Sequence, residues 1–314
     1  MLKLVISVIA VIFICAFVFV QLHSAKDIPV EQLKPQWTTS ASSFIKIGGL
    51  SLHVSDEGVK NDATPIVLIH GTGASLHTWD GWTSTLKHQR RVIRFDLPGF
   101  GLTGPEPQNN YTIENYTDYL IKLLDALGIP KAIIAGNSLG GYIAWATAIR
   151  YPDKVSKLVL VDASGYPYQA ESVPIAFKLS QNKSAKILLK NFIPKFIVRS
   201  SIENVYGDPS LVSDDLVDRY YQLALREGNR AAISERFTQT QPGDLRFKLG
   251  ELTIPTLLLW GGKDKLIPLH VGEQFKKDIP HSTLVVFDEL GHVPHEEAPE
   301  TTLSPVLAFI DAPH

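Results

Sequence analysis

Short, almost wholly apolar runs recur along this chain, and segments with helical spacing of apolar residues separate them. The runs are expected to be strands, at residues 65–69, 91–95, 132–135, 157–161, 256–260 and 283–287. Two further strands, at 44–47 and 50–54, are predicted on either side of Gly48-Gly49. Strands that are buried on both faces read as continuous apolar runs, so the alternation predicts a mostly parallel sheet with helices on both faces. The chain is therefore expected to have an α/β fold.

Residues 166–246 interrupt this alternation, because they show helical patterns and no convincing strand. They lie between two predicted core strands, which indicates a helical cap inserted into the core. We therefore expect an α/β core made of residues 44–165 and 247–314. Residues 25–43 are polar and contain two prolines, which predicts a linker.

The N-terminal segment, residues 1–24, is dominated by an apolar run from Leu4 to Val20 that only Ser7 interrupts. As a helix this run would span about 26 Å, near the lower limit for crossing a bilayer. We expect an uncleaved membrane anchor with a single pass, and Lys3 before the run favours a catalytic domain outside the cytoplasm. The alternative is a cleaved signal peptide and a secreted protein, although no Ala-x-Ala site follows the run.

Charge and composition limit the partners of this chain. A formal net charge of −2 over 314 residues gives no electrostatic reason to expect a nucleic-acid partner. The single cysteine, Cys15, excludes an internal disulfide and a cysteine-based metal site. The glycines around residue 138 lack the Gly-x-Gly-x-x-Gly spacing of a dinucleotide site. We therefore expect no cofactor and no metal ion, and the sequence leaves the oligomeric state open.

One serine stands between glycines where a predicted strand becomes a predicted helix, in Gly136-Asn137-Ser138-Leu139-Gly140-Gly141. A serine there could simply be the N-cap of the helix. The glycines instead favour a Gly-x-Ser-x-Gly nucleophile elbow, a sharp turn that presents the hydroxyl at the top of a sheet. A serine nucleophile needs a base within hydrogen-bond reach and an acid that orients this base. Such residues lie beyond the carboxyl ends of parallel strands, where this chain has His70, Asp96, Ser138, Asp162, Asp264 and His292.

From residue 44 to the C-terminus the chain resembles the α/β-hydrolase superfamily, in particular its capped esterases, lipases and carbon–carbon bond hydrolases. The resemblance rests on the elbow and on four further motifs: His70-Gly71-Thr72-Gly73, Asp96-Leu97-Pro98-Gly99-Phe100-Gly101, Trp260-Gly261-Gly262-Lys263-Asp264 and Gly291-His292. The order Ser138, Asp264, His292 is also that of the superfamily. The resemblance implies that Ser138 is the nucleophile, His292 the base and Asp264 the acid. Asp162 stays open as an alternative acid, because some hydrolases of this fold place theirs after that strand.

The resemblance also implies an oxyanion hole made by the backbone N–H groups of Thr72 and Leu139. His70 is expected to shape its loop and Asp96 to fix its turn, whereas His295 is expected to be a surface neighbour of His292. The tryptophans are expected in the core or in a pocket wall, at positions 79, 82, 145 and 260.

The expected function is that of a serine hydrolase cleaving carboxylic esters, an esterase or lipase whose small-molecule substrate carries an apolar acyl chain, as a monoacylglycerol does. Carbon–carbon bond hydrolysis or cofactor-free perhydrolysis with the same triad is the alternative. Carbon–carbon hydrolases typically have Trp after the catalytic His, where this chain has Val293. A non-catalytic ligand receptor or scaffold is the alternative outside enzymes.

The predicted cap contains a stretch between residues 171 and 203 whose charged side chains are all basic. They are Lys178, Lys183, Lys186, Lys190, Lys195 and Arg199, and apolar residues lie between them. Ordinary cap helices with solvated lysines explain this pattern. It also fits a cap that rests on an anionic membrane surface, where each Lys or Arg contributes about 1 kcal/mol.

Overall fold

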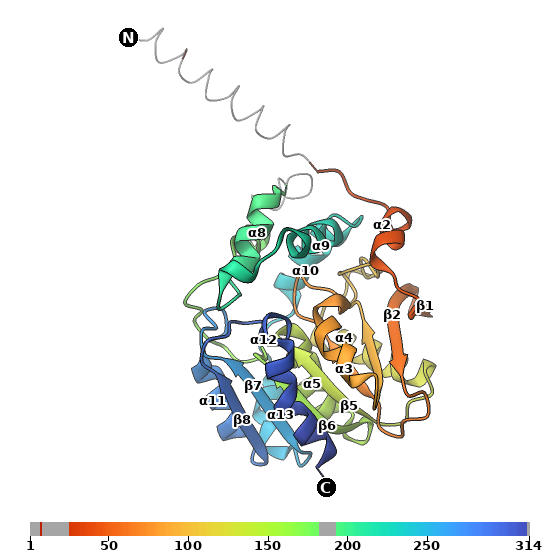
Figure 1. The fold of residues 1–314 in the computed structure, drawn as a ribbon, viewed down its shortest axis with the longest axis vertical. Helices are drawn as coiled ribbons and strands as arrows, with labels where there is room; N and C mark the ends of the chain where they lie inside the picture. The colour runs from red at the N-terminus through yellow and green to blue at the C-terminus, as the bar shows by residue number, and fades with distance from the viewer. Residues whose placement is uncertain (1–6, 8–24, 182–192, 313–314) are drawn as a thin grey trace.

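The computed structural model describes Ser7 and residues 25–181 and 193–312. Its centre is one eight-stranded sheet with the strand order β1-β2-β4-β3-β5-β6-β7-β8 (Figure 1). β1 pairs antiparallel with β2, and β2 pairs antiparallel with β4. All neighbours in the remaining order β4-β3-β5-β6-β7-β8 pair in parallel. The predicted α/β fold with a mostly parallel sheet is therefore confirmed.

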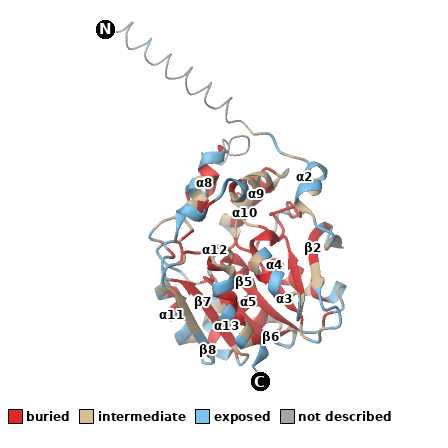
Figure 2. Cartoon of the chain, viewed as in Figure 1, coloured by how far each residue is buried: buried red, intermediate tan, exposed pale blue. Residues whose placement is uncertain are grey.

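Each predicted strand is present, with ends that differ from the prediction by a few residues at most. The strands are β1 Ser42–Ile47, β2 Leu50–Gly58, β3 Ile66–Ile69, β4 Arg91–Phe95, β5 Ala132–Asn137, β6 Val155–Val161, β7 Thr256–Gly261 and β8 Ser282–Phe287. Every residue of β3, β5, β6 and β7 is buried. The continuous apolar runs thus reflect strands that are covered on both faces, and Figure 2 shows this burial concentrated in the sheet.

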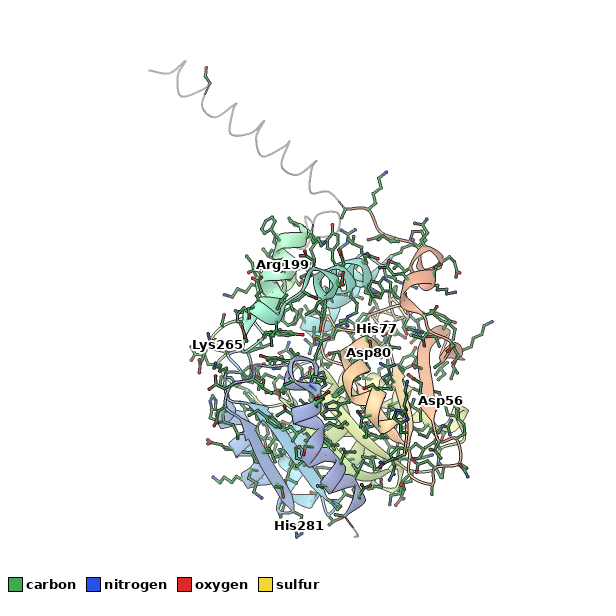
Figure 3. The ribbon with its side chains drawn as sticks, viewed as in Figure 1. Asp56, His77, Asp80, Arg199, Lys265 and His281 are labelled. Atoms are coloured by element: carbon green, nitrogen blue, oxygen red, sulfur yellow. The ribbon has the colours of Figure 1, made fainter. Side chains whose placement is uncertain are left out.

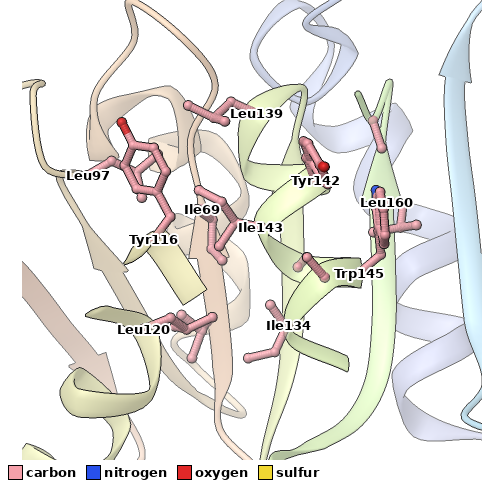
Figure 4. Close-up of a cluster of buried hydrophobic side chains, with 14 of the residues drawn as sticks. Ile69, Leu97, Tyr116, Leu120, Ile134, Leu139, Tyr142, Ile143, Trp145 and Leu160 are labelled. Carbon is pink, nitrogen blue, oxygen red and sulfur yellow. The ribbon is translucent and has the colours of Figure 1, made fainter. Parts of the chain in front are cut away.

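Helices cover both faces of the sheet, because alternate residues of each strand point to opposite sides. On one face α4 (Ile113–Ala126), α5 (Leu139–Arg150) and α11 (Leu269–Asp278) pack on strand residues such as Ile69, Ile134 and Leu160 (Figure 4). On the other face α3 (Asp80–Leu86) and α13 (Pro299–Asp311) pack on the intervening residues, among them Leu68 and Val159. All four tryptophans expected in the core or in a pocket wall are fully buried: Trp79, Trp82, Trp145 and Trp260.

Between β6 and β7 the described residues form helices and no strand of the sheet. The helices α6 (Ile175–Gln181), α8 (Lys195–Glu203), α9 (Asp214–Ala224) and α10 (Asn229–Gln239), with the described loops that join them, are called the cap from here on. They lie above the carboxyl ends of the parallel strands (Figure 1). The boundaries of the cap at residues 166 and 246 stay a prediction.

Two basic residues of the cap are paired with acids, which the local sequence did not indicate. Lys195 forms an ion pair with Asp218, and Arg199 on α8, which is labelled in Figure 3, forms one with Asp214. Both acids belong to α9. Pairing between α8 and α9 leaves less free positive charge on the cap than the sequence of residues 171–203 suggests. Lys183, Lys186 and Lys190 lie outside the described residues.

The expected linker at residues 25–43 is more structured than predicted. It contains helix α2 (Val30–Trp37) and the start of β1. The Trp37 Nε1–H donates to Gln222 of α9 at 3.1 Å, and Arg230 pairs with Asp27 at 2.6 Å. Contacts with the distant cap thus stabilise a polar segment, and the bounds of the linker stay a prediction.

No helix within residues 25–181 and 193–312 is long and apolar enough to cross a membrane. The anchor predicted at residues 1–24 lies outside the described part of the chain, apart from Ser7.

Candidate active site

Ser138 occupies a strained turn between β5 and α5. Its backbone has φ 53° and ψ −114°, a conformation that residues other than glycine rarely adopt. The side chain makes no capping hydrogen bond to the helix, which argues against the simple N-cap interpretation. Strain of this kind persists where the surrounding structure enforces it, and it occurs often at functional sites.

The glycines of the elbow are required by close contacts between chain segments. A Cβ atom on Gly136 would lie 2.2 Å from the carbonyl oxygen of Gly140, and one on Gly140 would lie 2.1 Å from that of Ile69. A Cβ atom on Gly141 would meet the side chain of Ala163 at 2.5 Å. The missing side chains therefore let α5 start directly against β3 and the end of β6.

His292 and Asp264 form a buried pair beside the elbow. The Nδ1 atom of His292 lies 2.7 Å from Oδ2 of Asp264, and both side chains are almost fully enclosed. The other oxygen of Asp264 accepts hydrogen bonds from the backbone N–H groups of Leu266 at 2.8 Å and Ile267 at 2.9 Å. A carboxylate at Nδ1 fixes the imidazole with its proton on that atom, which leaves Nε2 available as a base. His292 and Ser138 line the same cavity.

Asp162 lies close to this pair but does not contact His292 in the same way. Its Oδ1 accepts a hydrogen bond from the Gly261 N–H at 2.9 Å, and its Oδ2 has no partner among the described residues. Burial, and then the neighbouring Asp264, raise the pKa of Asp162 well above its ordinary value, which favours the neutral acid. The histidine is thus paired with Asp264, and Asp162 is a neighbouring acid whose neutral form is favoured.

These three residues also offer the donor atoms of a possible metal site. One ligand atom each from Asp162, Asp264 and His292 lie within 4.8 Å of one another. Asp264 already accepts hydrogen bonds at both oxygens, and it holds Nδ1 of His292. This donor set fits a hydrogen-bonded acid–base pair better than a set of metal ligands.

The backbone groups predicted for an oxyanion hole flank Ser138. Thr72 lines the cavity with Ser138, and a Cβ atom on the adjacent Gly71 would lie 3.1 Å from the Ser138 Cβ atom. Leu139 is the first residue of α5, whose dipole favours an anion at this end. Neither the Thr72 nor the Leu139 backbone N–H donates to another described residue. Both donors are therefore available to a bound oxygen atom.

His70 is a buried, hydrogen-bonded residue of the neighbouring loop. Its Nδ1 lies 2.8 Å from the Gly71 carbonyl oxygen, and its Nε2 accepts from the Leu97 N–H at 2.9 Å. Burial lowers the pKa of His70, so the neutral ring is favoured. These contacts agree with the loop-shaping role expected from the sequence.

His295 does not lie on the surface, so that expectation is wrong. The side chain is fully buried, its Nε2 lies 3.1 Å from the Thr78 hydroxyl, and its ring lies 4.0 Å from that of Trp79. Burial lowers the pKa of His295 well below its ordinary value. The sequence around His295 carries no signal of this burial, because the enclosing residues are far away in the chain.

The cap forms the outer wall of the cavity that contains Ser138 and His292, and the sequence did not indicate which of its residues line this wall. The wall includes Phe177, Val198, Ile202, Tyr220, Asn229, Arg230 and Ile233. Apolar residues on amphipathic cap helices were the available signal, but helical spacing alone does not show which of them face the cavity.

Comparison with known proteins places this geometry in a family. The family model for the alpha/beta hydrolase fold matches residues 64–299. A 2-hydroxymuconate semialdehyde hydrolase of Pseudomonas putida is 32% identical over 291 residues, which cover 89% of this chain and 99% of that protein. A solved meta-cleavage product hydrolase of Pseudomonas fluorescens IP01 is similar, with TM-score 0.74, 26% identity and coverage of 86% of this chain and 97% of that one.

An enzyme described as an esterase is similar to the same degree. The solved thermophilic esterase of Thermogutta terrifontis matches with TM-score 0.70 and 26% identity, over 86% of this chain and 96% of that one. The family model covers well over half of the chain, including the elbow and the buried pair of His292 and Asp264. The chain belongs to the alpha/beta hydrolase fold family.

Proposed function

We propose that the protein is a serine hydrolase that cleaves carboxylic esters with an apolar acyl group. The Ser138 oxygen adds to the ester carbonyl carbon while Nε2 of His292 takes the hydroxyl proton. The leaving alcohol receives this proton when the intermediate collapses to the acyl-enzyme. A water molecule then adds to the acyl carbon and gives a proton to His292, which returns it to Ser138 as the acid leaves.

Asp264 and the two backbone N–H donors orient the base and stabilise the charges that develop during the reaction. Asp264 holds the imidazole and stabilises its protonated form. The N–H groups of Thr72 and Leu139 donate to the carbonyl oxygen as it becomes negative, and each donor of this kind is worth about 3–4 kcal/mol in other enzymes.

The observation that carries the choice of substrate is the lining of the cavity. The side chains around Ser138 and His292 are mostly apolar, from both the core and the cap. Of the described lining residues, Arg230 is the one Lys or Arg, and Asp27 pairs with it at 2.6 Å. Asp27 accepts from Nε and Nη2 of Arg230, whereas the buried Nη1 has no hydrogen-bond partner among the described residues. The ion pair offsets the arginine charge, and the apolar lining favours an uncharged acyl chain.

Carbon–carbon bond hydrolysis is the second candidate, and the names of the relatives favour it. The semialdehyde hydrolase and the meta-cleavage product hydrolase are both of this class. Muconate and related dienoates carry a carboxylate, for which a free cation in the cavity would be expected. The pairing of Arg230 with Asp27, and Val293 after the histidine, therefore favour the ester substrate.

A substrate panel separates the two candidates. We expect p-nitrophenyl esters with acyl chains of several carbons to be hydrolysed with a higher kcat/KM than the acetate ester, and 2-hydroxymuconate semialdehyde to be cleaved more slowly than either. A fluorophosphonate probe should label Ser138 covalently. Faster cleavage of the semialdehyde than of any ester would reverse the choice, and failure of the probe to label the protein would favour a receptor or scaffold.

We also propose that residues 4–20 anchor the enzyme in a membrane and that the cap faces this membrane. The contacts of Asp27 with Arg230, and of the Ile28 N–H with the Leu225 carbonyl oxygen at 2.7 Å, support this placement, because they join the described N-terminal residues to the cap. Ile175 and Leu211 are exposed cap side chains that an apolar surface could cover.

The membrane proposal is tested by deletion. Protein without its first 25 residues should be active and soluble, and it should bind anionic vesicles more weakly at high salt. Replacing Lys183, Lys186 and Lys190 together with Gln should reduce this binding. Uncleaved full-length protein in the soluble fraction contradicts the anchor, and unchanged vesicle binding of the triple variant contradicts the charge contribution.

A further inference from the structure

The turn that follows His292 is the most direct connection between the candidate active site and the cap. Helix α12 (Pro294–Glu297) begins two residues after His292 and lies between the core and the cap helices (Figure 1). Its last two residues, Glu296 and Glu297, both send their carboxylates to the cap, but they bind different parts of it.

Glu297 joins a loop of the cap to the loop of the histidine. Its Oε2 accepts hydrogen bonds from the backbone N–H of Gly207 at 3.0 Å and from that of Gly291 at 2.9 Å. Its Oε1 accepts from the N–H of Asp208 at 2.8 Å. One charged side chain thus holds two loops through three hydrogen bonds, which are stronger than bonds between neutral groups.

The two loops also touch directly, backbone against backbone. The N–H of His292 donates to the Val205 carbonyl oxygen at 2.7 Å. A Cβ atom on Gly291 would lie 2.4 Å from that same oxygen, and one on Gly207 would lie 2.2 Å from the Glu289 carbonyl oxygen. Because no side chain separates the loops, a displacement of the cap loop 205–208 displaces the backbone of His292.

Glu296 offers a matched comparison. Its carboxylate pairs with Arg219 and accepts from the Tyr220 hydroxyl at 2.8 Å, both on helix α9, and it also interacts with the Tyr206 side chain. This side chain has no hydrogen bond to residues 290–292 among the described residues. It therefore fastens the cap without holding the loop of the histidine.

We propose that Glu297 is a positioning residue that couples the cap to His292. The core fixes the imidazole at Nδ1 through Asp264, and Glu297 with the cap loop fixes the backbone that carries the ring. Proton transfer from Ser138 depends on the position of Nε2, and a misplacement of about 1 Å can cost about 100-fold in rate. This inference rests on the proposed function, because it takes His292 as the base.

The experiment compares Glu297→Gln with Glu296→Gln in the full chain. In Glu297→Gln the charge is lost, and the amide NH₂ faces backbone N–H groups that need an acceptor. We expect kcat to fall about 10- to 100-fold with KM changed less than about 3-fold, and the rate of fluorophosphonate labelling to fall with kcat. Glu296→Gln should keep kcat within about 3-fold of wild type and change mainly KM, since Tyr220 lines the cavity.

Two outcomes overturn the proposal: folded Glu297→Gln with wild-type kcat and labelling rate, or an equal loss of kcat in Glu296→Gln. Should Glu297→Gln fail to fold, Glu297→Asp keeps the charge but shortens the reach, and it should show the same selective loss of kcat. Labelling of the wild-type protein tests the proposed function separately from the coupling through Glu297. If wild type is not labelled, the proposed function fails; if it is labelled and the Glu297 variants match it, only the coupling fails.

Discussion

Among the described residues, two groups of Ser, His and Asp lie in series, and one of these two lines the cavity. In the first, the Ser42 hydroxyl lies 2.9 Å from Nε2 of His53, and Nδ1 of His53 lies 2.8 Å from Oδ2 of Asp96. In the second, Nδ1 of His292 lies 2.7 Å from Asp264, and Ser138 lines the cavity together with the histidine. The two histidine–aspartate pairs are alike in distance and in burial.

What differs is the surroundings of the serine. Ser42 sits in the regular strand β1 opposite Ser55 of β2, and its hydroxyl accepts a hydrogen bond from the Thr39 N–H at 3.0 Å. Ser138 sits in a strained elbow at φ 53°, beside two backbone N–H groups that donate to no other described residue. Neither Ser42 nor His53 lines the cavity.

Asp96 is also held differently from Asp264. It accepts hydrogen bonds from the backbone N–H groups of Leu76 and Leu102, both at 2.8 Å, so it ties two loops together. Burial would raise the pKa of Asp96, but His53 and other histidines lower it below the ordinary value. A hydrogen-bonded Ser–His–Asp line is therefore insufficient for a nucleophile, which also needs an elbow, a cavity and free donors for the oxyanion.

The largest expected difference concerns the two serines. Ser138→Ala should lower kcat for ester hydrolysis on the order of 10⁴- to 10⁶-fold without unfolding the protein, because the nucleophile is lost. Ser42→Ala should leave kcat within a few-fold of wild type. Steady-state kinetics and mass spectrometry of the fluorophosphonate-labelled peptide check this, and a label on Ser42 would erase the distinction.

Loss of His292 should reduce activity, whereas loss of His53 should reduce stability. His292→Ala should reduce kcat about as strongly as Ser138→Ala, since the triad members act as a unit, while stability changes little. His53→Ala leaves the buried Asp96 carboxylate without its partner, which should cost about 3–5 kcal/mol of unfolding free energy. Urea unfolding and kinetics at low temperature separate these losses, and a His53→Ala variant of wild-type stability contradicts the structural role of the pair.

The sequence predicted what depends on local patterns. Strands such as Ile66–Ile69 read as continuous apolar runs because both faces are buried, and the glycines around Ser138 mark close contacts within one turn. The pairing of His292 with Asp264 followed from a resemblance and from the ends of the strands.

What the sequence could not predict depends on partners far away in the chain. His295 is buried against Thr78, which lies 217 positions earlier, and α2 is held by Gln222, which lies 185 positions after Trp37. The line through Ser42 and His53 was missed because Asp96 was expected only to fix its turn. The coupling of Glu297 to Gly207 likewise has no periodic signal, since a side chain binds backbone groups there.

Substitution of Asp264 should lower kcat far more than substitution of Asp162, although both acids lie near His292. Asp264→Asn removes the carboxylate at Nδ1 and favours the wrong tautomer, so kcat should fall by up to about 10⁴-fold. Asp162→Asn replaces an acid whose neutral form is favoured, so kcat should change by less than about 10-fold. A larger loss in Asp162→Asn than in Asp264→Asn would make Asp162 the acid of the triad.

The smallest expected effect is on stability and its dependence on pH. Burial and Asp264 raise the pKa of Asp162 above 3.8, so the folded protein holds a proton that the unfolded chain releases as pH rises. The folded state then binds more protons than the unfolded state, and this residue lowers the unfolding free energy as pH increases from about 4 toward the raised pKa. Asp162→Asn should abolish this fall in unfolding free energy, because an amide does not ionise. The Tm difference between Asp162→Asn and wild type, measured by calorimetry, should therefore grow in favour of the variant between pH 4 and pH 8. A difference that is constant with pH, or that favours wild type at pH 8, would mean that Asp162 is charged in the folded protein and acts as a second carboxylate beside His292.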